Sequence, residues 1–228
     1  MANINRINGF SPVAYLGGAA YTGAAKLYAI PTSDTTNSYA IGDVVVSAGG
    51  ADTDGIVYIK KVPAASASSF VALGVVVGVR VADPSVSLVG TTLSLEQTYI
   101  KAGTRTAVRY VYVADDPLLM FEVSGGLTAT NLTAAKLRYN AGIGSYYSGA
   151  DQTYAINQDA TVTTLTPSSP YSNTIVSSAT VNTTNTLPIQ ILGLKQTPDN
   201  AVGAYSRLLV KFNSHEFGVA TGTNFTGL

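Results

Sequence analysis

The residue types that could do acid–base or nucleophilic chemistry are few in this sequence. It contains one histidine, His215, with Ser214 and Glu216 on either side. Neighbouring side chains on a strand point to opposite faces, so this spacing does not bring the three together as a Ser–His–acid triad requires. We interpret His215 as a histidine at the surface or at the end of a strand. Hydrolysis by paired carboxylates stays open, because it needs only two acids that meet in a cleft.

Two clusters of aspartates could suggest a metal site, and turns explain both of them. Asp52-Thr53-Asp54-Gly55 resembles the opening of a calcium-binding loop, but the apolar Ile56 and Val57 follow where further ligands are needed. In Asp115-Asp116-Pro117 two like charges lie side by side, which costs least in an exposed turn. The chain has no cysteine, so disulfides and thiolate metal sites are excluded. We predict no catalytic residues, no metal and no cofactor.

Composition favours a protein whose surface becomes covered by other subunits. Charged residues make up 11 % of the 228 residues, against about 25 % in ordinary soluble domains. The 13 basic residues are balanced by 13 acids, and Lys60-Lys61 is the only adjacent basic pair. Nucleic-acid binding normally needs clustered basic residues, so the sequence argues against it.

The sequence predicts neither a signal peptide nor a segment that spans a membrane. Residues 1–6 lack the apolar region of a signal peptide, and the longest apolar run, residues 70–79, is too short to cross a bilayer. We therefore expect a protein that is made in a cytoplasm and stays soluble there until it assembles with something.

The clearest structural signal is the strand–turn–strand pattern of residues 109–123. Tyr110 to Val113 are strong strand formers, Asp115-Asp116-Pro117 breaks the run, and residues 118–123 resume it with one charge, Glu122. We interpret this unit as a hairpin. Leu127 to Leu137 contains the one plausible helix start, with Thr130 as N-cap. Further strands are expected at residues 25–30, 44–47, 56–62, 70–81, 86–95, 187–194 and 205–213.

Short strands separated by turn clusters predict an all-β fold, a single β-sandwich or barrel that is jelly-roll-like. Residues 1–20 are expected to form an N-terminal arm without regular structure, residues 21–217 the domain, and residues 218–228 a C-terminal tail. The apolar residues of the arm fit either a docking arm or a segment that lies on its own core. Residues 138–186 are predicted to be a loop-rich insertion.

Tyrosine is the prominent aromatic residue, with 14 tyrosines against six phenylalanines and no tryptophan. A tyrosine ring covers apolar area while its hydroxyl stays hydrogen-bonded, which suits a wet interface. Tyrosine also stacks on sugars, so a glycan-binding surface is the alternative. The residues that we expect to contact partners are Ile4, Arg6, Phe10, Tyr15, Tyr146, Tyr147, Tyr154 and Phe225.

Several segments, in order from end to end, together resemble the head-decoration or cement proteins of tailed bacteriophages. They are Met1–Arg6, Gly9–Val13, Gly18–Gly23, Ile30-Pro31 with Ile41–Val45, Ala51–Gly55, Leu73–Gly78, Arg109–Pro117 with Phe121–Val123, Ile191–Leu194, Pro198–Asn200 and Leu209–His215. Residues 118–120 depart from the acid-containing continuation that follows the aspartates in the family, and residues 138–186 look enlarged.

The resemblance implies a structural, non-enzymatic protein on the outer surface of a phage capsid, made in the cytoplasm of the bacterial host. Its partners would be the major capsid protein and itself, as a homo-oligomer (a dimer or trimer). Many modest contacts to several shell subunits would then add up by multivalency. The alternatives are a glycan-binding adhesion module displayed on a virion and a carboxylate-based hydrolase.

Overall fold

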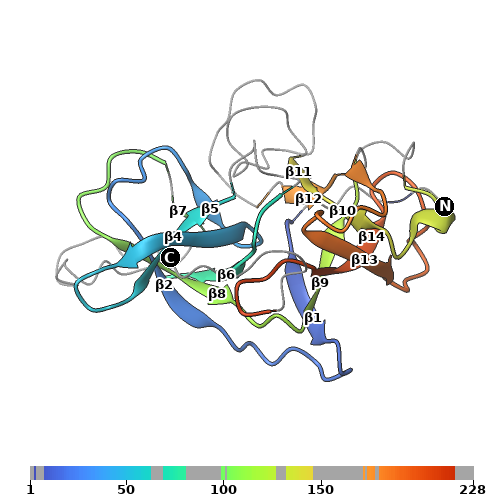
Figure 1. The fold of residues 1–228 in the computed structure, drawn as a ribbon, viewed down its shortest axis with the longest axis horizontal. Coiled ribbons are helices and arrows are strands. Elements are labelled where there is room, and N and C mark those ends of the chain that lie inside the picture. The colour runs from blue at the N-terminus through green and yellow to red at the C-terminus, as the bar shows by residue number, and fades with distance from the viewer. Residues whose placement is uncertain are drawn as a thin grey trace.

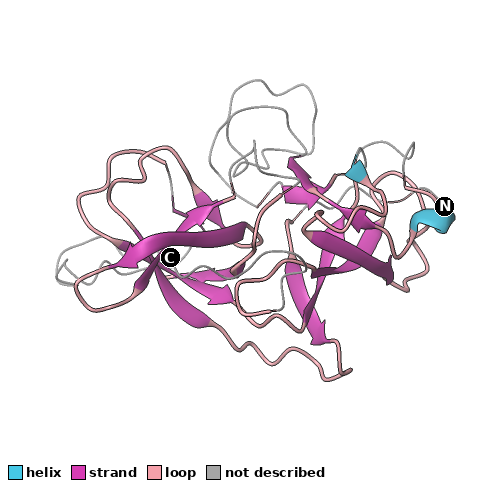
Figure 2. Ribbon diagram, viewed as in Figure 1, coloured by secondary structure: helices cyan, strands magenta, loops and turns pink. Residues whose placement is uncertain are grey.

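The structure is a computed structural model that describes residues 3, 8–62, 69–80, 99–100, 102–126, 132–145, 172, 174–177 and 180–218. The prediction of an all-β fold is confirmed: the described residues form strands and turns, with a short 3₁₀ turn, η3, at Ala134–Lys136 and no α-helix (Figure 2). The strands form a closed barrel beside an open sheet, instead of the two facing sheets of a jelly roll.

Five strands close the barrel in the order β2-β5-β4-β6-β8. They are β2 (Lys26–Ile30), β4 (Val44–Ala51), β5 (Val57–Lys61), β6 (Gly74–Val79) and β8 (Arg109–Ala114). β2 and β5 pair in parallel and the other pairs are antiparallel. Alternating β-branched and aromatic side chains fill one apolar cluster, which contains Tyr28, Ile30, Val45, Ile59, Val76, Val111 and Val113.

An open antiparallel sheet of five strands lies beside the barrel, on the right in Figure 1, in the order β1-β9-β14-β13-β10. The strands are β1 (Ser11–Tyr15), β9 (Leu119–Ser124), β10 (Asn140–Ala141), β13 (Ile189–Leu194) and β14 (Arg207–Phe212). Two short pairs complete the described fold: β3 (Tyr39–Ala40) with β7 (Tyr99–Ile100), and β11 (Ile143–Ser145) with β12 (Thr174–Val176).

Barrel and sheet share a second apolar cluster, so they are packed as one body. Val44, Val75 and Ala114 from the barrel belong to the same cluster as the buried side chains of β9, β13 and β14. At its centre the rings of Phe10 and Phe212 stack with centroids 5.8 Å apart, and both meet Phe121. Aromatic pairs of this kind add about 1 kcal/mol each beyond the area that they bury.

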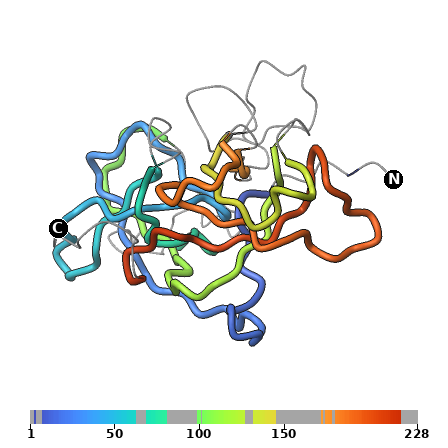
Figure 3. Tube along the Cα trace, turned by 45° about the vertical axis from the view of Figure 1, so that its right-hand side comes forward, coloured from blue at the N-terminus to red at the C-terminus, as the bar shows by residue number. Residues whose placement is uncertain are grey.

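The hairpin expected at residues 109–123 is wrong in its pairing, although both of its strands are present. β8 pairs with β2 and β6 in the barrel, whereas β9 pairs with β1 and β14 in the sheet. Asp115-Asp116-Pro117 is therefore the connection from barrel to sheet, where the chain passes from one to the other (Figure 3). A turn does form at Pro117-Leu118, but a local turn signal does not say which strands will pair.

The expectation that Asp115 lies in an exposed turn is wrong, because its side chain is buried. Its carboxylate accepts a hydrogen bond from the Tyr28 hydroxyl (2.7 Å) and forms an ion pair with Lys26 Nζ (3.0 Å). Both partners come from β2, so Asp115 ties the crossing segment to the barrel. Burial, followed by this hydrogen bond, raises the pKa of Tyr28.

Asp116 is the turn-former of the pair, and its removal tests the crossing. Its Oδ1 accepts the Leu118 amide at 2.8 Å, and its carbonyl accepts the Leu119 amide. We expect Asp116→Ala to lower the free energy of unfolding by about 1 kcal/mol, the usual value of such a bond, in urea melts. Asp54→Ala is the control, because the Asp54 side chain makes no hydrogen bond there. Equal losses in the two variants would contradict this role for Asp116.

The expected N-terminal arm is also corrected where the structure describes it. Residues 11–15 form the regular strand β1, paired with β9, and Phe10 is 1 % exposed at the centre of the shared core. Of the two interpretations of the arm, this part is a segment that lies on its own core. Its apolar residues are needed inside the molecule, because they cover the open sheet next to the barrel.

One of the two glycines of β6, Gly74, allows this strand to lie close to its neighbour. A Cβ at Gly74 would lie 2.2 Å from the Ala114 carbonyl oxygen, so only glycine fits there. The register between β6 and β8 shifts between Val76 and Gly78, which confirms the expected bulge. The strands expected at residues 25–30, 56–62, 187–194 and 205–213 are confirmed with boundaries shifted by a few residues.

Candidate functional site

Three large apolar side chains are exposed where barrel and sheet meet: Leu16, Leu118 and Phe217, which are 42 %, 58 % and 54 % exposed. The segments that carry them touch. The Leu16 amide donates to the Leu118 carbonyl oxygen at 2.8 Å, and a Cβ at Gly218 would lie 3.3 Å from Pro117 Cβ. We call these three residues the junction surface. Exposed apolar side chains that gather in one place are typical of interaction sites.

Phe217 is held in position although it is exposed. Its amide donates to His215 Nδ1 at 3.1 Å, and Lys26 Nζ lies 5.2 Å from the centre of its ring. Lys26 is in turn held by Asp115 across the barrel-to-sheet crossing. An aromatic ring fixed in this way loses little conformational entropy on binding, which is what an interface anchor requires.

His215 lies beneath this surface and is 3 % exposed, so of the two positions expected for it the surface is wrong. It follows the end of β14 and forms an isolated bridge with Ala72. Its Nε2 is buried and has no hydrogen-bond partner among the described residues, and its ring packs against Phe212 and Phe217. Burial lowers the pKa of His215 to about 4, and the nearby carboxylates of Asp115 and Asp116 only partly oppose this. At neutral pH the ring is therefore uncharged. It contributes to packing, not to proton transfer with a substrate.

A buried charged cluster ties the barrel to the segment that carries β12. Asp43 and Lys61 form an ion pair at 3.2 Å, with side chains 0 % and 4 % exposed. Asp43 also accepts hydrogen bonds from the Ala40 amide (2.8 Å) and the Ser172 hydroxyl (2.6 Å). Serine, lysine and aspartate together could suggest a nucleophile. However, Ser172 is fully buried, so no substrate reaches its hydroxyl.

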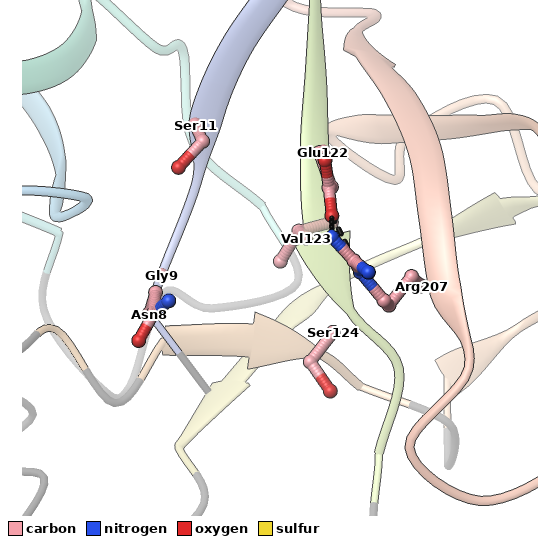
Figure 4. Close-up of a pocket in the computed structure, with 7 residues that line it drawn as sticks. All are labelled: Asn8, Gly9, Ser11, Glu122, Val123, Ser124 and Arg207. Carbon is pink, nitrogen blue, oxygen red and sulfur yellow. Dashed lines mark hydrogen bonds and ion pairs between the residues drawn. The ribbon is translucent and has the colours of Figure 1, made fainter. Parts of the chain in front are cut away.

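A polar pocket of about 190 Å³ lies against β9 of the sheet. Figure 4 shows its residues, which are Asn8, Gly9, Ser11, Glu122, Val123, Ser124 and Arg207. β1, β9 and β14 bring them together from three distant parts of the sequence, since Ser11 and Leu209 both lie opposite Glu122 in the strand register. Sequence reasoning missed this pocket, because its ion pairs join residues more than 70 positions apart.

Most of the residues expected to contact partners lie outside the described part of the chain. These are Ile4, Arg6, Tyr146, Tyr147, Tyr154 and Phe225. Phe10 is a core residue, and Tyr15, on β1, is half-buried against the same core. Neither of the two described residues, Phe10 and Tyr15, forms part of the junction surface or lines the polar pocket.

The acidic turn at Asp52 is structural, as expected. Asp52 Oδ1 accepts the amides of Asp54 and Ile56, and its Oδ2 accepts the Tyr110 hydroxyl at 2.7 Å. This hydrogen bond is the main reason why the pKa of Tyr110 rises to about 12. Across the described residues, no three His, Cys, Asp or Glu side chains are grouped so that they could hold a metal ion.

None of the helical segments in the described residues is long and apolar enough to cross a membrane. Comparison with known proteins adds no relative: no protein-family model, no curated protein and no solved structure matches this chain.

Proposed function

We propose that the protein is a structural decoration or cement protein, which binds the outside of a phage head as a homo-oligomer and bridges subunits of the major capsid protein. The ordered set of sequence segments that resembles this family is the main support. The junction surface is the structural observation that carries the proposal, because it offers an exposed aromatic ring and two exposed leucines on a body with little charge.

The proposal describes a scaffold rather than an enzyme. The buried polar side chains described above are occupied with internal contacts: Asp43 with Lys61, Asp115 with Tyr28 and Lys26, and His215 with Phe217. Such contacts stiffen a body that must resist displacement on a surface. Several modest contacts per oligomer then give firm attachment, because linked sites raise the overall avidity by roughly 10² to 10⁴.

Phe217→Ala tests the junction surface. We expect it to weaken co-sedimentation with undecorated phage heads by at least about tenfold, because an aromatic anchor typically contributes 2 kcal/mol or more to an interface. Thermal stability should change little, since the ring is 54 % exposed. Val57→Ala is the matched control, because Val57 is an exposed apolar residue on β5, outside the junction surface.

Binding of the wild-type protein to the same undecorated heads, and its effect on their release of DNA, test the proposed function as a whole. Wild-type protein should bind them saturably and reduce the release of DNA on heating. If wild-type protein neither binds the heads nor changes DNA release, the proposed function is wrong. If it binds and Phe217→Ala binds equally well, the junction surface is not the contact.

A further inference from the structure

The polar pocket on the sheet is lined by one anion and one cation, Glu122 and Arg207, and a second cation, Lys195, pairs with Glu122 from outside the lining. Glu122 on β9 is bracketed by Arg207 on β14 and by Lys195, which follows β13, and both cations contact its carboxylate (Figure 4 shows the first pair). Arg207 Nε donates to Glu122 Oε1 at 2.6 Å, and Lys195 Nζ contacts Oε2. Two cations against one carboxylate leave one net positive charge.

The two cations are held by the backbone as well as by Glu122. The Asn200 side chain donates to the carbonyl oxygens of Lys195 and Arg207, each at 2.8 Å, and accepts the Arg207 amide at 2.9 Å. The side chains of Arg207 and Lys195 are 24 % and 33 % exposed, so they can still be reached from solvent. Positively charged groups that are fixed in advance bind an anion at low entropic cost.

The pocket also has hydrogen-bond donors that the described residues leave unused. Arg207 has five N–H donors, and Glu122 engages only Nε and Nη2, so Nη1 is left with both of its hydrogens. The amide of Asn8 and the hydroxyl of Ser11 line the same space and have no side-chain hydrogen bond in the described structure. The pocket therefore supplies donors beside a three-residue cluster with one net positive charge, which together complement an oxyanion.

The presence of Glu122 in the wall decides which oxyanion fits. A phosphate dianion would bring two charges next to a carboxylate, whereas one net positive charge balances a single negative charge. A carboxylate is also planar and matches the fork of a guanidinium. We propose that this pocket binds one carboxylate group, which an aspartate or glutamate side chain of a partner protein supplies. The identity of that partner as a capsid subunit rests on the proposed function above.

A pair of substitutions tests the pocket without any partner. Ser11 lies directly opposite Glu122 in the strand pair and lines the pocket, so Ser11→Glu places a carboxylate at its mouth, and Ser11→Gln is the neutral match. We expect Ser11→Glu to melt about 2 to 4 °C above Ser11→Gln, and the difference to shrink in about 1 M NaCl, where charges are screened beyond about 3 Å. If Ser11→Glu melts at or below Ser11→Gln, repulsion from Glu122 dominates and the proposal is wrong.

A titration of the wild-type protein gives a second, independent measurement. Sodium acetate should shift the amide NMR signals of Ser11, Glu122 and Ser124 saturably, relative to NaCl at equal ionic strength. Arg207→Gln should weaken this binding at least about tenfold, the effect of losing roughly 1.4 kcal/mol. Lys211→Gln, which removes another cation of β14 outside the pocket, should leave it unchanged. Linear, unsaturated shifts, or tighter binding of inorganic phosphate than of acetate, would overturn the choice of a carboxylate.

Binding to phage heads separates this inference from the proposed function. If wild-type protein binds heads, Arg207→Gln and Ser11→Glu should both bind at least about tenfold more weakly, while Lys211→Gln, which lies outside the pocket, binds normally. Normal binding of Arg207→Gln would show that the partner supplies no carboxylate to this pocket. If the wild-type protein does not bind heads at all, the proposed function fails, and the Ser11 pair and the acetate titration still decide whether the pocket exists.

Discussion

Replacing Lys61 by Met should lower the free energy of unfolding by about 3 to 5 kcal/mol, the usual cost of leaving one member of a buried ion pair without its partner. Asp43 is 0 % exposed, so water cannot replace the ammonium group that lies 3.2 Å from its carboxylate. The hydrogen bonds from Ala40 and Ser172 remain, but neutral donors do not balance the charge. Urea denaturation at neutral pH measures the loss.

The matched control is the neighbouring residue on the same strand. Lys60 is exposed, so Lys60→Met should change stability by less than about 0.5 kcal/mol. A double variant, Asp43→Asn with Lys61→Met, removes both charges and should cost less than the sum of the two single variants. If Lys61→Met were as mild as Lys60→Met, the buried Asp43 would not depend on Lys61 for its charge balance.

Lowering the pH from 6.5 to 4 should lower the free energy of unfolding by about 3 kcal/mol because of His215. A difference of one pKa unit between the folded and unfolded states corresponds to about 1.36 kcal/mol. The unfolded chain binds a proton at His215 below its ordinary pKa of 6.5, whereas the folded protein does so only below a pKa of about 4. Between these values the unfolded state binds more protons. The contribution of the uncharged His215 to the free energy of unfolding is therefore fully present above pH 6.5, and it is lost as the pH falls toward 4.

His215→Gln isolates this contribution from other acid effects. Glutamine does not titrate, and its side-chain oxygen can replace Nδ1 as acceptor of the Phe217 amide. The variant should have lower stability at pH 7 but a flatter dependence on pH between 6.5 and 4 than the wild type. Parallel curves for the two proteins, from urea melts at several pH values, would show that His215 is not the titrating group.

The strands could be predicted from the sequence, but their partners could not. Alternation of Tyr110 to Val113 and the β-branched run before Val79 are local patterns, and both became strands. Pairing depends on contacts between residues far apart in the chain, and this explains why β8 and β9 separate into barrel and sheet. Asp115 looked like a turn residue because its partner Tyr28 is 87 positions away.

The candidate sites show the same limit. Phe10 was expected to dock on a neighbour because an apolar residue in a Gly- and Asn-rich segment looked unsupported, yet Phe121 and Phe212 cover it. The polar pocket left no local signal at all, since Glu122, Lys195 and Arg207 are ordinary charges in three separate segments. Only the sheet order brings them together.

The short pair of β11 and β12 has a consequence for how this chain can vary. Ser145 and Thr174 lie opposite each other, so whatever sequence joins them leaves and re-enters the fold at one place. Doubling the length of such a connection costs only about 0.6 kcal/mol of chain entropy. We therefore expect an insertion between these two strand ends to leave the pairing of β11 with β12 in place, provided that Ser172 keeps its bond to Asp43.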